Sequence, residues 1–366
     1  MSQFIHDLAS PRIIFGYGAR SSLREEIERL GCRRALLIST PGQADAAANA
    51  VNDSRHLITA SFNGAVMHTP TDVTQVARSV VVDAKADCLL CVGGGSTTGL
   101  AKAIALHTGL PIIALPTTYA GSEVTSILGQ TENGAKTTMR DPVMLPKVVI
   151  YDAALTQTLP RATSITSALN AAAHAVEALY AADRTPLTDA MALGGLEAIG
   201  RSLPLLAAGD DGVAVRDDLL CGAWLCGSVL GATSMGLHHK LCHTLGGALN
   251  LPHAETHSLL LGQVAAFNQP GAPEAIARAK HALGIAEGID SIFVWIKTLG
   301  VQMALADFGV EERALDHVAD LAVQSPYANP VQITREGIRA LLERAYSGLA
   351  PAITAPLKME ALNGGN

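Results

Sequence analysis

The amino-acid sequence predicts an α/β amino-terminal domain with a parallel, Rossmann-like sheet, followed by an all-α carboxyl-terminal domain. Short apolar runs alternate with amphipathic helical segments up to about residue 160, and Ala- and Leu-rich helical periodicity fills the remainder. The 366 residues exceed what one hydrophobic core usually supports. We therefore expect two domains, over residues 1–160 and 161–366.

The predicted strands are short runs rich in Leu, Ile, Val and Ala, typical of strands buried on both faces. They are Arg34–Thr40, Ala86–Val92, Pro111–Pro116 and Val148–Tyr151. The amphipathic segments between them include Ser21–Leu30 and Thr74–Ala84. A hairpin with a tight turn at Asn133-Gly134 is expected within Leu128–Thr138.

Long helices are predicted for the second domain, because apolar residues recur there at helical spacing with Gly and Pro between the segments. The clearest are Ser164–Ala181, Pro186–Leu203, Val215–Ser234 and Thr334–Ser347.

Composition and charge exclude several classes of protein. The net charge is −7 without any run of Lys and Arg, so nucleic acid is not an expected partner. The chain begins without a basic and then apolar leader, which favours a cytoplasmic location. Two uncharged stretches, Ala103–Ser122 and Leu219–His239, contain Pro, Gly or polar residues and are expected to be buried elements instead of membrane spans. Cys88 and Cys91 lie in an apolar run, where we expect buried thiols.

A glycine-rich loop carries the strongest local signal for a ligand. Gly93, Gly94, Gly95 and Ser96 follow a predicted strand and open a helix. Exposed backbone N–H groups and the positive end of the helix would there face a phosphate-bearing cofactor. The loop matches neither common phosphate-binding motif, so a tight turn without a ligand is the alternative.

A second loop begins with Thr117 and Thr118, directly after the next predicted strand. Ligands of open α/β sheets bind at the carboxyl ends of strands, so both loops are expected to share one ligand. A Ser or Thr helix cap with Glu123 as its partner is the alternative. At the end of another strand, Thr40 stands where NAD-selective enzymes place an acidic residue against the ribose 2′-hydroxyl.

Five of the twelve histidines fall between residues 238 and 257. His239 and His243 are four residues apart and share a helix face, as do Asn170 and His174 on another expected helix. Such imidazoles hold a divalent metal or, without metal, donate protons and bind anions. A lone histidine in this apolar background would more often be structural, whereas several that converge favour a functional site.

Over nearly its whole length the chain resembles the iron-containing alcohol dehydrogenase superfamily. Residues 236–246 match its motif Gly–aliphatic–x–His–x–aliphatic–Ala–His–x–aliphatic–Gly, and Pro252-His253-Ala254 matches Pro-His-Gly, with Cys242 and Ala254 as departures. Asn170, the stretch GGGSTTGLAK and the stretch PTTYAGSEVT are similar to the maleylacetate reductases, a metal-independent branch. In GGGSTTGLAK, Gly99 occupies a position where the superfamily usually has Asp.

The resemblance implies a role for each matched residue. Four residues fall at the family's metal-ligand positions, and these are Asn170, His174, His239 and His253. Asn170 replaces the usual Asp, and an amide is a weaker ligand than a carboxylate, so no metal is expected. If one binds, His174, His239 and His253 would hold it. The implied cofactor contacts are Gly93, Gly94, Gly95 and Ser96 with the pyrophosphate, Thr117 and Thr118 with the adenosine side, and Lys136 with the nicotinamide ribose.

The activity implied is the NADH- or NADPH-dependent reduction of maleylacetate, a small dicarboxylate, to 3-oxoadipate during aromatic breakdown, by a homodimer. His243 and His253 are the expected proton donors or enolate stabilisers of a protonated pocket that His174 and His239 line. The expected substrate contacts are Asn170, Lys240 and Tyr119. His257 and His281 lie outside the matched motif and are expected to contribute little. A metal-dependent alcohol dehydrogenase, a dehydroquinate-synthase-like lyase and a cofactor-binding sensor are the alternatives.

Overall fold

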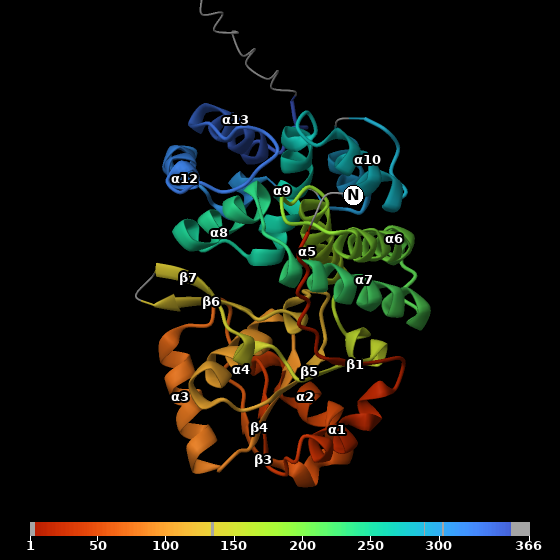
Figure 1. The fold of residues 1–366 in the computed structure, drawn as a ribbon, viewed down its shortest axis with the longest axis vertical. Coiled ribbons are helices and arrows are strands. Elements are labelled where there is room, and N and C mark those ends of the chain that lie inside the picture. The colour runs from red at the N-terminus through yellow and green to blue at the C-terminus, as the bar shows by residue number, and fades with distance from the viewer. Residues whose placement is uncertain (1–3, 133–134, 289, 302–303, 353–366) are drawn as a thin grey trace, which may run out of the picture.

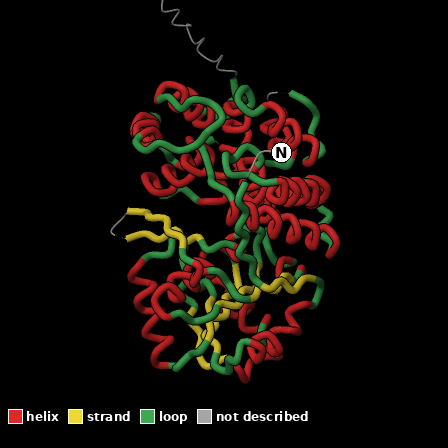
Figure 2. The backbone as a smooth tube through the Cα atoms, viewed as in Figure 1, coloured by secondary structure: helices red, strands yellow, loops and turns green. Residues whose placement is uncertain are grey.

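A computed structural model describes residues 4–132, 135–288, 290–301 and 304–352 (Figure 1). A sheet flanked by helices forms one half of the molecule and a group of helices forms the other, and the strands are confined to the first half (Figure 2). The described strands all end by Tyr151, and from Arg161 on the described elements are helices. This confirms the predicted fold class. The domain boundary near residue 160 stays a prediction, which the change of element type supports.

The main sheet has six strands, all parallel, in the order β1-β8-β5-β4-β2-β3. Their bounds are β1 Arg12–Phe15, β2 Ala35–Ile38, β3 Ile58–Phe62, β4 Cys88–Gly93, β5 Ile112–Pro116 and β8 Val148–Tyr151. The four inner strands are those predicted from the sequence. β1 and β3 were not predicted, because edge strands are only half-buried and lack a continuous apolar run.

Helices cover both faces of this sheet. Alternate strand residues point to opposite faces, so Leu37 and Leu90 pack with α1 (Leu23–Arg29) and α2 (Ala44–Ala50). Leu36, Leu89 and Ile112 pack on the other side with α3 (Thr71–Asp83) and α4 (Gly95–Thr108). The predicted hairpin is present as β6 (Ile127–Glu132) and β7 (Ala135–Arg140), and its turn at Asn133-Gly134 lies outside the described residues.

The two thiols of the CxxC stretch are buried inside β4, as predicted. The Sγ of Cys91 contacts the carbonyl oxygen of Ile113 at 3.6 Å. Burial raises the pKa of the Cys91 thiol to about 12 and that of Cys88 still further, so both stay protonated at neutral pH.

The second half consists of helices, four of which confirm the predicted segments. Their bounds are α5 Arg161–Ala178, α6 Pro186–Ala208, α7 Val213–Ala232, α8 Leu237–Leu249, α9 His253–Asn268, α10 Pro273–Ala282, α11 Ser291–Thr298, α12 Ala314–Val323 and α13 Arg335–Tyr346. No single helix among the described residues has the length and hydropathy to cross a bilayer. Only α7 and α8 taken together reach them, with a bend of 94° between the two.

Helix α5 lies at the centre of this half and is buried on almost every side from Ser164 onwards. Its many alanines allow α6, α7 and α9 to approach closely. The close approach continues between α6 and α7, where a Cβ atom on Gly195 would stand 2.6 Å from the Sγ of Cys226. Small residues therefore let α5 become a fully enclosed helix that can carry buried polar side chains.

The two halves meet at the loop that follows β5. Gly121 in this loop has φ +78°, and a Cβ atom on it would lie 2.8 Å from the Cα of Gly227 in α7. Backbone thus packs directly on backbone. Nearby, the buried guanidinium of Arg216 donates to the carbonyl of Thr156 and to the hydroxyl of Tyr119. These contacts fix the loop after β5 against the helical half.

Lys102 holds the same loop from the side of the sheet. Its ammonium group is fully buried, with the carbonyl oxygens of Ser122 and Ile127 at 2.7 and 2.8 Å and the hydroxyl of Thr125 at 3.0 Å. An ammonium group has three N–H donors, so these contacts satisfy it. One buried side chain thereby ties α4 to both ends of the segment 122–127.

We predict that Lys102→Met lowers the free energy of unfolding by about 1–3 kcal/mol, because it leaves buried acceptors without a donor. Urea denaturation followed by circular dichroism measures this change. Lys147→Met is the matched control, since that side chain is exposed, and it should stay within about 0.5 kcal/mol of the wild type. Equal stability of the two variants would contradict the role assigned to Lys102.

Candidate active site

A cavity of about 500 Å³ opens at the carboxyl ends of the strands. Of the residues predicted to bind a cofactor, all except Lys136 line it, namely Thr40, Gly93, Gly94, Gly95, Ser96, Thr117 and Thr118. The amide of Thr117 donates to the carbonyl of Gly93 at 3.0 Å and ties the two loops to each other. The alternative helix cap is absent, because the Glu123 carboxylate accepts instead from the Tyr151 hydroxyl at 2.7 Å.

The glycines are needed because other groups come close to their backbone. A Cβ atom on Gly94 would stand 2.8 Å from the Thr118 side chain, and one on Gly93 would stand 2.8 Å from Thr97. A Cβ atom on Gly95 would meet nothing within 4 Å, so the backbone there is open to the cavity. Helix α4 begins at this point, and the free amides of its first turn suit a pyrophosphate. The loop therefore fits a dinucleotide cofactor.

The contacts around residue 99 explain why a glycine stands there. A Cβ atom on it would stand 2.5 Å from the hydroxyl of Thr69, which is buried. Thr69 and the preceding His68 have φ values of 45° and 66°, which side-chain-bearing residues rarely adopt. The segment before α3 therefore occupies the space beside α4 that a larger residue at position 99 would fill.

Several lining residues were not predicted from the sequence. They are Arg20, Gln43, Asn49 and Thr158, and no local motif marks them. None of the described residues that line this cavity is acidic. The guanidinium group of Arg20 adds a positive charge to the lining and forms an ion pair with the Asp152 carboxylate, at an N–O distance of 3.9 Å.

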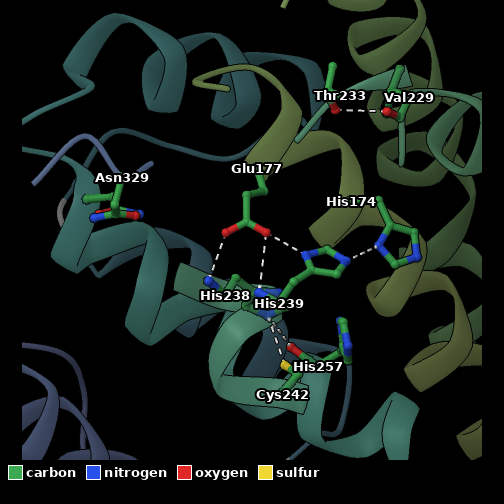
Figure 3. A network of polar contacts seen from close by, with 10 residues as sticks. His174, Glu177, Val229, Thr233, His238, His239, Cys242, His257 and Asn329 are labelled. Carbon is green, nitrogen blue, oxygen red and sulfur yellow. Dashed lines mark hydrogen bonds and ion pairs between the residues drawn. The ribbon is translucent and has the colours of Figure 1, made fainter. Parts of the chain in front are cut away.

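The histidines gather behind the loop that follows β5 and form two layers. His243 and His253 are half-buried, with ring centroids 6.4 Å apart. The imidazoles of His174, His238, His239 and His257 form the other layer and are buried (Figure 3). His243 and His253 are therefore the more accessible of these imidazoles, and their role as donors stays a prediction.

A row of polar contacts runs through the buried layer. The Glu177 carboxylate contacts Nδ1 of His239, and Nε2 of His239 lies 2.8 Å from Nδ1 of His174 (Figure 3). Nε2 of His174 lies 3.4 Å from the carbonyl oxygen of Ala120. Ala120 follows the cavity-lining Thr118 by two residues, so one short loop joins the cavity to the histidines.

Glu177 was not predicted, yet its carboxylate contacts the ring of His239, a residue at the centre of this cluster. Its carboxylate also accepts from the backbone amides of His238 and His239, at 2.8 and 3.3 Å. These amides lie in the first turn of α8, which receives no cap from its own N-cap residue, Gly236. One feature of the sequence could have identified Glu177: it is an acidic residue in an otherwise apolar helix, one turn after His174. Glu is rarely buried without a partner, so such a residue indicates a buried polar contact.

His257 corrects one expectation. It was placed outside the site, but its imidazole is fully buried at the centre of the cluster, 4.2 Å from His253 and 5.0 Å from His239 between ring centroids. Neither of its ring nitrogens has a hydrogen-bond partner among the described residues. Four residues after His253 on α9, it occupies the same helix face, a spacing that could have identified it. His281 is exposed on α10.

The buried histidines also correct the expectation of a uniformly protonated pocket. Burial and the neighbouring imidazoles hold the pKa values of His174, His239 and His257 well below the usual range. Burial raises the pKa of Glu177, so the Glu177–His239 pair favours its neutral form. His243 and His253 are half-buried and therefore more accessible to solvent than these imidazoles.

The three predicted substrate contacts differ in their burial and in their hydrogen-bond partners. Asn170 is buried on the same helix as His174. Its amide nitrogen lies 3.5 Å from the carbonyl of Ala120, and its Oδ1 has no hydrogen-bond partner among the described residues. Tyr119 is fully buried with its hydroxyl against Arg216, which contradicts its assignment to the substrate. Lys240 is half-buried on α8. The side chain of Lys136 lies outside the described residues.

The metal-ligand set that the resemblance implies is not assembled in this structure. In a tetrahedral site with bonds of about 2.0–2.1 Å, nitrogen ligands stand about 3.3 Å apart, but His174 Nδ1 and His239 Nε2 are in direct hydrogen-bond contact at 2.8 Å. His257 is the third member of the group around them, whereas no such group among the described residues includes His253. The carboxylate ligand is missing as well, because Asn170 stands in its place.

Comparisons with known proteins identify the family of this chain. Residues 10–153 match the iron-containing alcohol dehydrogenase family model, and residues 164–346 match the C-terminal model of that family. The chain is 47% identical to a maleylacetate reductase of Burkholderia cepacia and 49% identical to one of Rhizobium sp. strain MTP-10005. Each match covers 96% of this chain and all of the relative.

A solved structure gives the same result in three dimensions. The crystal structure of maleylacetate reductase from Agrobacterium tumefaciens is 50% identical in sequence and superposes with a TM-score of 0.91, over 96% of this chain and all of that one. The glycine loop, the histidine layers and these matches lead to one assignment. The chain belongs to the iron-containing alcohol dehydrogenase family and, within it, to the maleylacetate reductases.

Proposed function

We propose that this chain reduces the C=C bond of maleylacetate to give 3-oxoadipate, with NADH or NADPH as hydride donor and without a metal. The observation that carries the proposal is the joining of the cavity at the glycine loop to the histidine cluster by one loop, residues 117–120. The relatives named maleylacetate reductase match over their full length, which favours this reaction over the alcohol dehydrogenase and lyase alternatives.

The histidines suit the chemistry of a conjugated ketone. When bound, NAD(P)H supplies a hydride to the alkene carbon remote from the ketone. Negative charge then develops on the ketone oxygen as an enolate, where N–H donors stabilise it. His243 and His253 form the more accessible layer, so they are the proposed donors. Because conjugation carries the charge to an oxygen that imidazoles can hold, the reaction needs no Lewis acid.

Lys240 and Asn170 are the proposed substrate contacts that remain. Within the described part of the chain, Asn170 Oδ1 is a buried acceptor without a hydrogen-bond partner. Lys240 is the cation closest in sequence to His239. A homodimer and a cytoplasmic location also stay predictions.

The first prediction concerns the metal. Full activity should remain after exhaustive chelation, and elemental analysis should find no stoichiometric zinc or iron in the active protein. Asn170→Asp should strengthen metal binding and lower maleylacetate turnover, because the new anion opposes both the substrate carboxylates and the enolate. Chelator-sensitive turnover that returns with added Zn²⁺ or Fe²⁺ would overturn the metal-free assignment.

The second prediction concerns the half-buried histidines. His243→Ala and His253→Ala should each lower kcat by roughly 10²–10⁴, the usual cost of removing a positioned proton donor. His281→Ala is the matched control and should leave kcat unchanged, since that residue is exposed and distant in sequence from the cluster. NADH binding is measured separately by fluorescence titration. Near-wild-type turnover in both variants, or a loss explained by NADH binding alone, would exclude these residues from the chemistry.

The third prediction concerns cofactor choice. Both NADH and NADPH should support turnover, because the cavity-lining residue at the end of β2 is the neutral Thr40. Thr40→Asp should shift kcat/KM toward NADH at least tenfold, since a carboxylate repels the 2′-phosphate. Steady-state kinetics with each cofactor provide the test. A wild-type preference for NADH beyond roughly 1000-fold, on the order of 4 kcal/mol, would be too large for this neutral site.

A further inference from the structure

Three side chains that can ligate a metal ion converge at the amino-terminal end of β4. They are Cys32, Asp87 and Cys88, and one ligand atom from each lies within 4.8 Å of the other two. The cofactor cavity opens at the opposite end of the same strand, where Gly93 lines it. Cys88 and Gly93 are the first and last residues of β4, and at a rise of about 3.3 Å per residue they stand roughly 16 Å apart. This group is therefore separate from the candidate active site.

The fold brings Cys32 to this place because helix α1 ends just before it. Gly31 has φ +76°, a left-handed conformation that ends the helix, and the chain then enters β2. Ala35 at the start of β2 pairs with Cys88 at the start of β4. Cys32 thereby lies next to β4, with its Sγ 3.4 Å from the backbone carbonyl oxygen of Asp87, and both thiols are buried. The parallel pairing of β2 with β4 thus brings the two thiols close together.

The second thiol of the CxxC stretch takes no part in this group. Cys88 and Cys91 are three residues apart in a strand, so their side chains point to opposite faces of the sheet. Cys88 packs in the same buried cluster as Cys32, on the face that α1 and α2 cover. Cys91 packs on the other face, which α3 and α4 cover. The thiol that pairs with Cys88 therefore comes from a segment that the CxxC spacing did not indicate.

The carboxylate of Asp87 is oriented by two backbone amides. The amide of Arg33 donates to its two oxygens at 3.1 and 3.0 Å, and that of Arg34 donates to Oδ1 at 2.8 Å. A carboxylate has about four acceptor positions, so it can still bind a metal ion. The Asp87 side chain is 29% exposed, so water reaches the group and can supply a further ligand.

We propose that Cys32, Asp87 and Cys88 bind a thiophilic divalent ion of the class of Zn²⁺ and Cd²⁺. Thiolates select such ions, and two sulfur ligands on one tetrahedral ion with bonds of about 2.3 Å stand about 3.8 Å apart, within the span of this group. Each thiol releases its proton to solvent as its metal–sulfur bond forms, so one ion displaces two protons. The bound ion ties the segment after α1 to β4. The inference does not depend on the proposed reduction.

The charges around the group suit a divalent ion. Two thiolates and one carboxylate carry three negative charges, which the ion and the guanidinium of Arg34 balance, since its Nε lies 3.9 Å from Oδ2 of Asp87. Burial raises the pKa of the Cys32 and Cys88 thiols, so the ion has to displace their protons and its affinity falls as the pH falls. Exhaustive chelation removes the ion from this group as well, so the test of the active site is unaffected.

Cd²⁺ is the probe for this site, because Cd–thiolate bonds add a charge-transfer absorption in the ultraviolet. Chelated and reduced wild-type protein is titrated with CdCl₂ at neutral pH. We expect an absorption that saturates at one ion per chain, a rise in melting temperature, and removal of the absorption by excess Zn²⁺. The association constant should fall roughly 100-fold in Cys32→Ser and roughly tenfold in Asp87→Asn, since a hydroxyl and an amide are weaker ligands than a thiolate and a carboxylate.

Two thiols elsewhere in the chain provide the controls. Cys221→Ser changes a half-buried thiol of α7, and Cys242→Ala changes a thiol that forms another group of possible ligands with His238 and His257. Both variants should bind Cd²⁺ as the wild type does. Loss of the absorption in Cys242→Ala, with Cys32→Ser unchanged, places the ion at the histidines and overturns the proposal.

Other outcomes are equally decisive. The absence of a saturable absorption in the wild type, or its persistence at wild-type affinity in Cys32→Ser, overturns the site. An absorption that excess Zn²⁺ does not remove overturns the assignment to the class of Zn²⁺. If Cys32→Ser does not fold, Cys88→Ala decides by the same criterion. A saturable signal that is kept in both control variants and lost in Cys32→Ser establishes the site.

Discussion

Glu177 holds together two helices that carry the candidate active site. From the enclosed helix α5 its carboxyl group accepts from two amides in the first turn of α8 and meets the imidazole of His239. Asn170 and His174 lie on the same helix as Glu177, and His243 lies on the same helix as His239. Without this contact α8 would begin with unsatisfied buried amides, and the spacing between the histidines of α5 and α8 would be unspecified. A Cβ atom on Gly236 would stand 3.2 Å from Glu177, which explains a glycine at the start of α8.

The cofactor cavity and the histidines keep a fixed relation because the loop after β5 is held on both sides. Lys102 fixes it to α4, and the close approach of Gly121 to Gly227 fixes it to α7. Within a few residues the loop passes from Thr118, which lines the cavity, to Ala120, which contacts His174. In the proposed reaction, this arrangement would present a hydride donor in the cavity and a proton donor in the cluster to one substrate from neighbouring positions.

Features with a local pattern could be predicted, and features set by tertiary contact could not. The inner strands and the glycine loop have continuous apolar runs or a distinctive composition, and both were predicted. The edge strands β1 and β3 are half-exposed and lack such a run. Tyr119 lies in the predicted loop, but only the buried Arg216 of a distant helix explains why its hydroxyl turns away from the cavity. His257 and Glu177 were missed because their partners come from other helices, although a charged or polar residue in an apolar helix was a signal that both shared.

The central claim is that hydrogen bonds among imidazoles and a buried carboxyl group, and not a metal, organise this site. A crystal structure of the purified protein, with diffraction recorded at the zinc and iron absorption edges, tests it most directly. The account predicts no anomalous peak within the cluster and a direct contact between His174 Nδ1 and His239 Nε2 close to the 2.8 Å seen here. An anomalous peak about 2.0–2.1 Å from two or more of the imidazole nitrogens would contradict it.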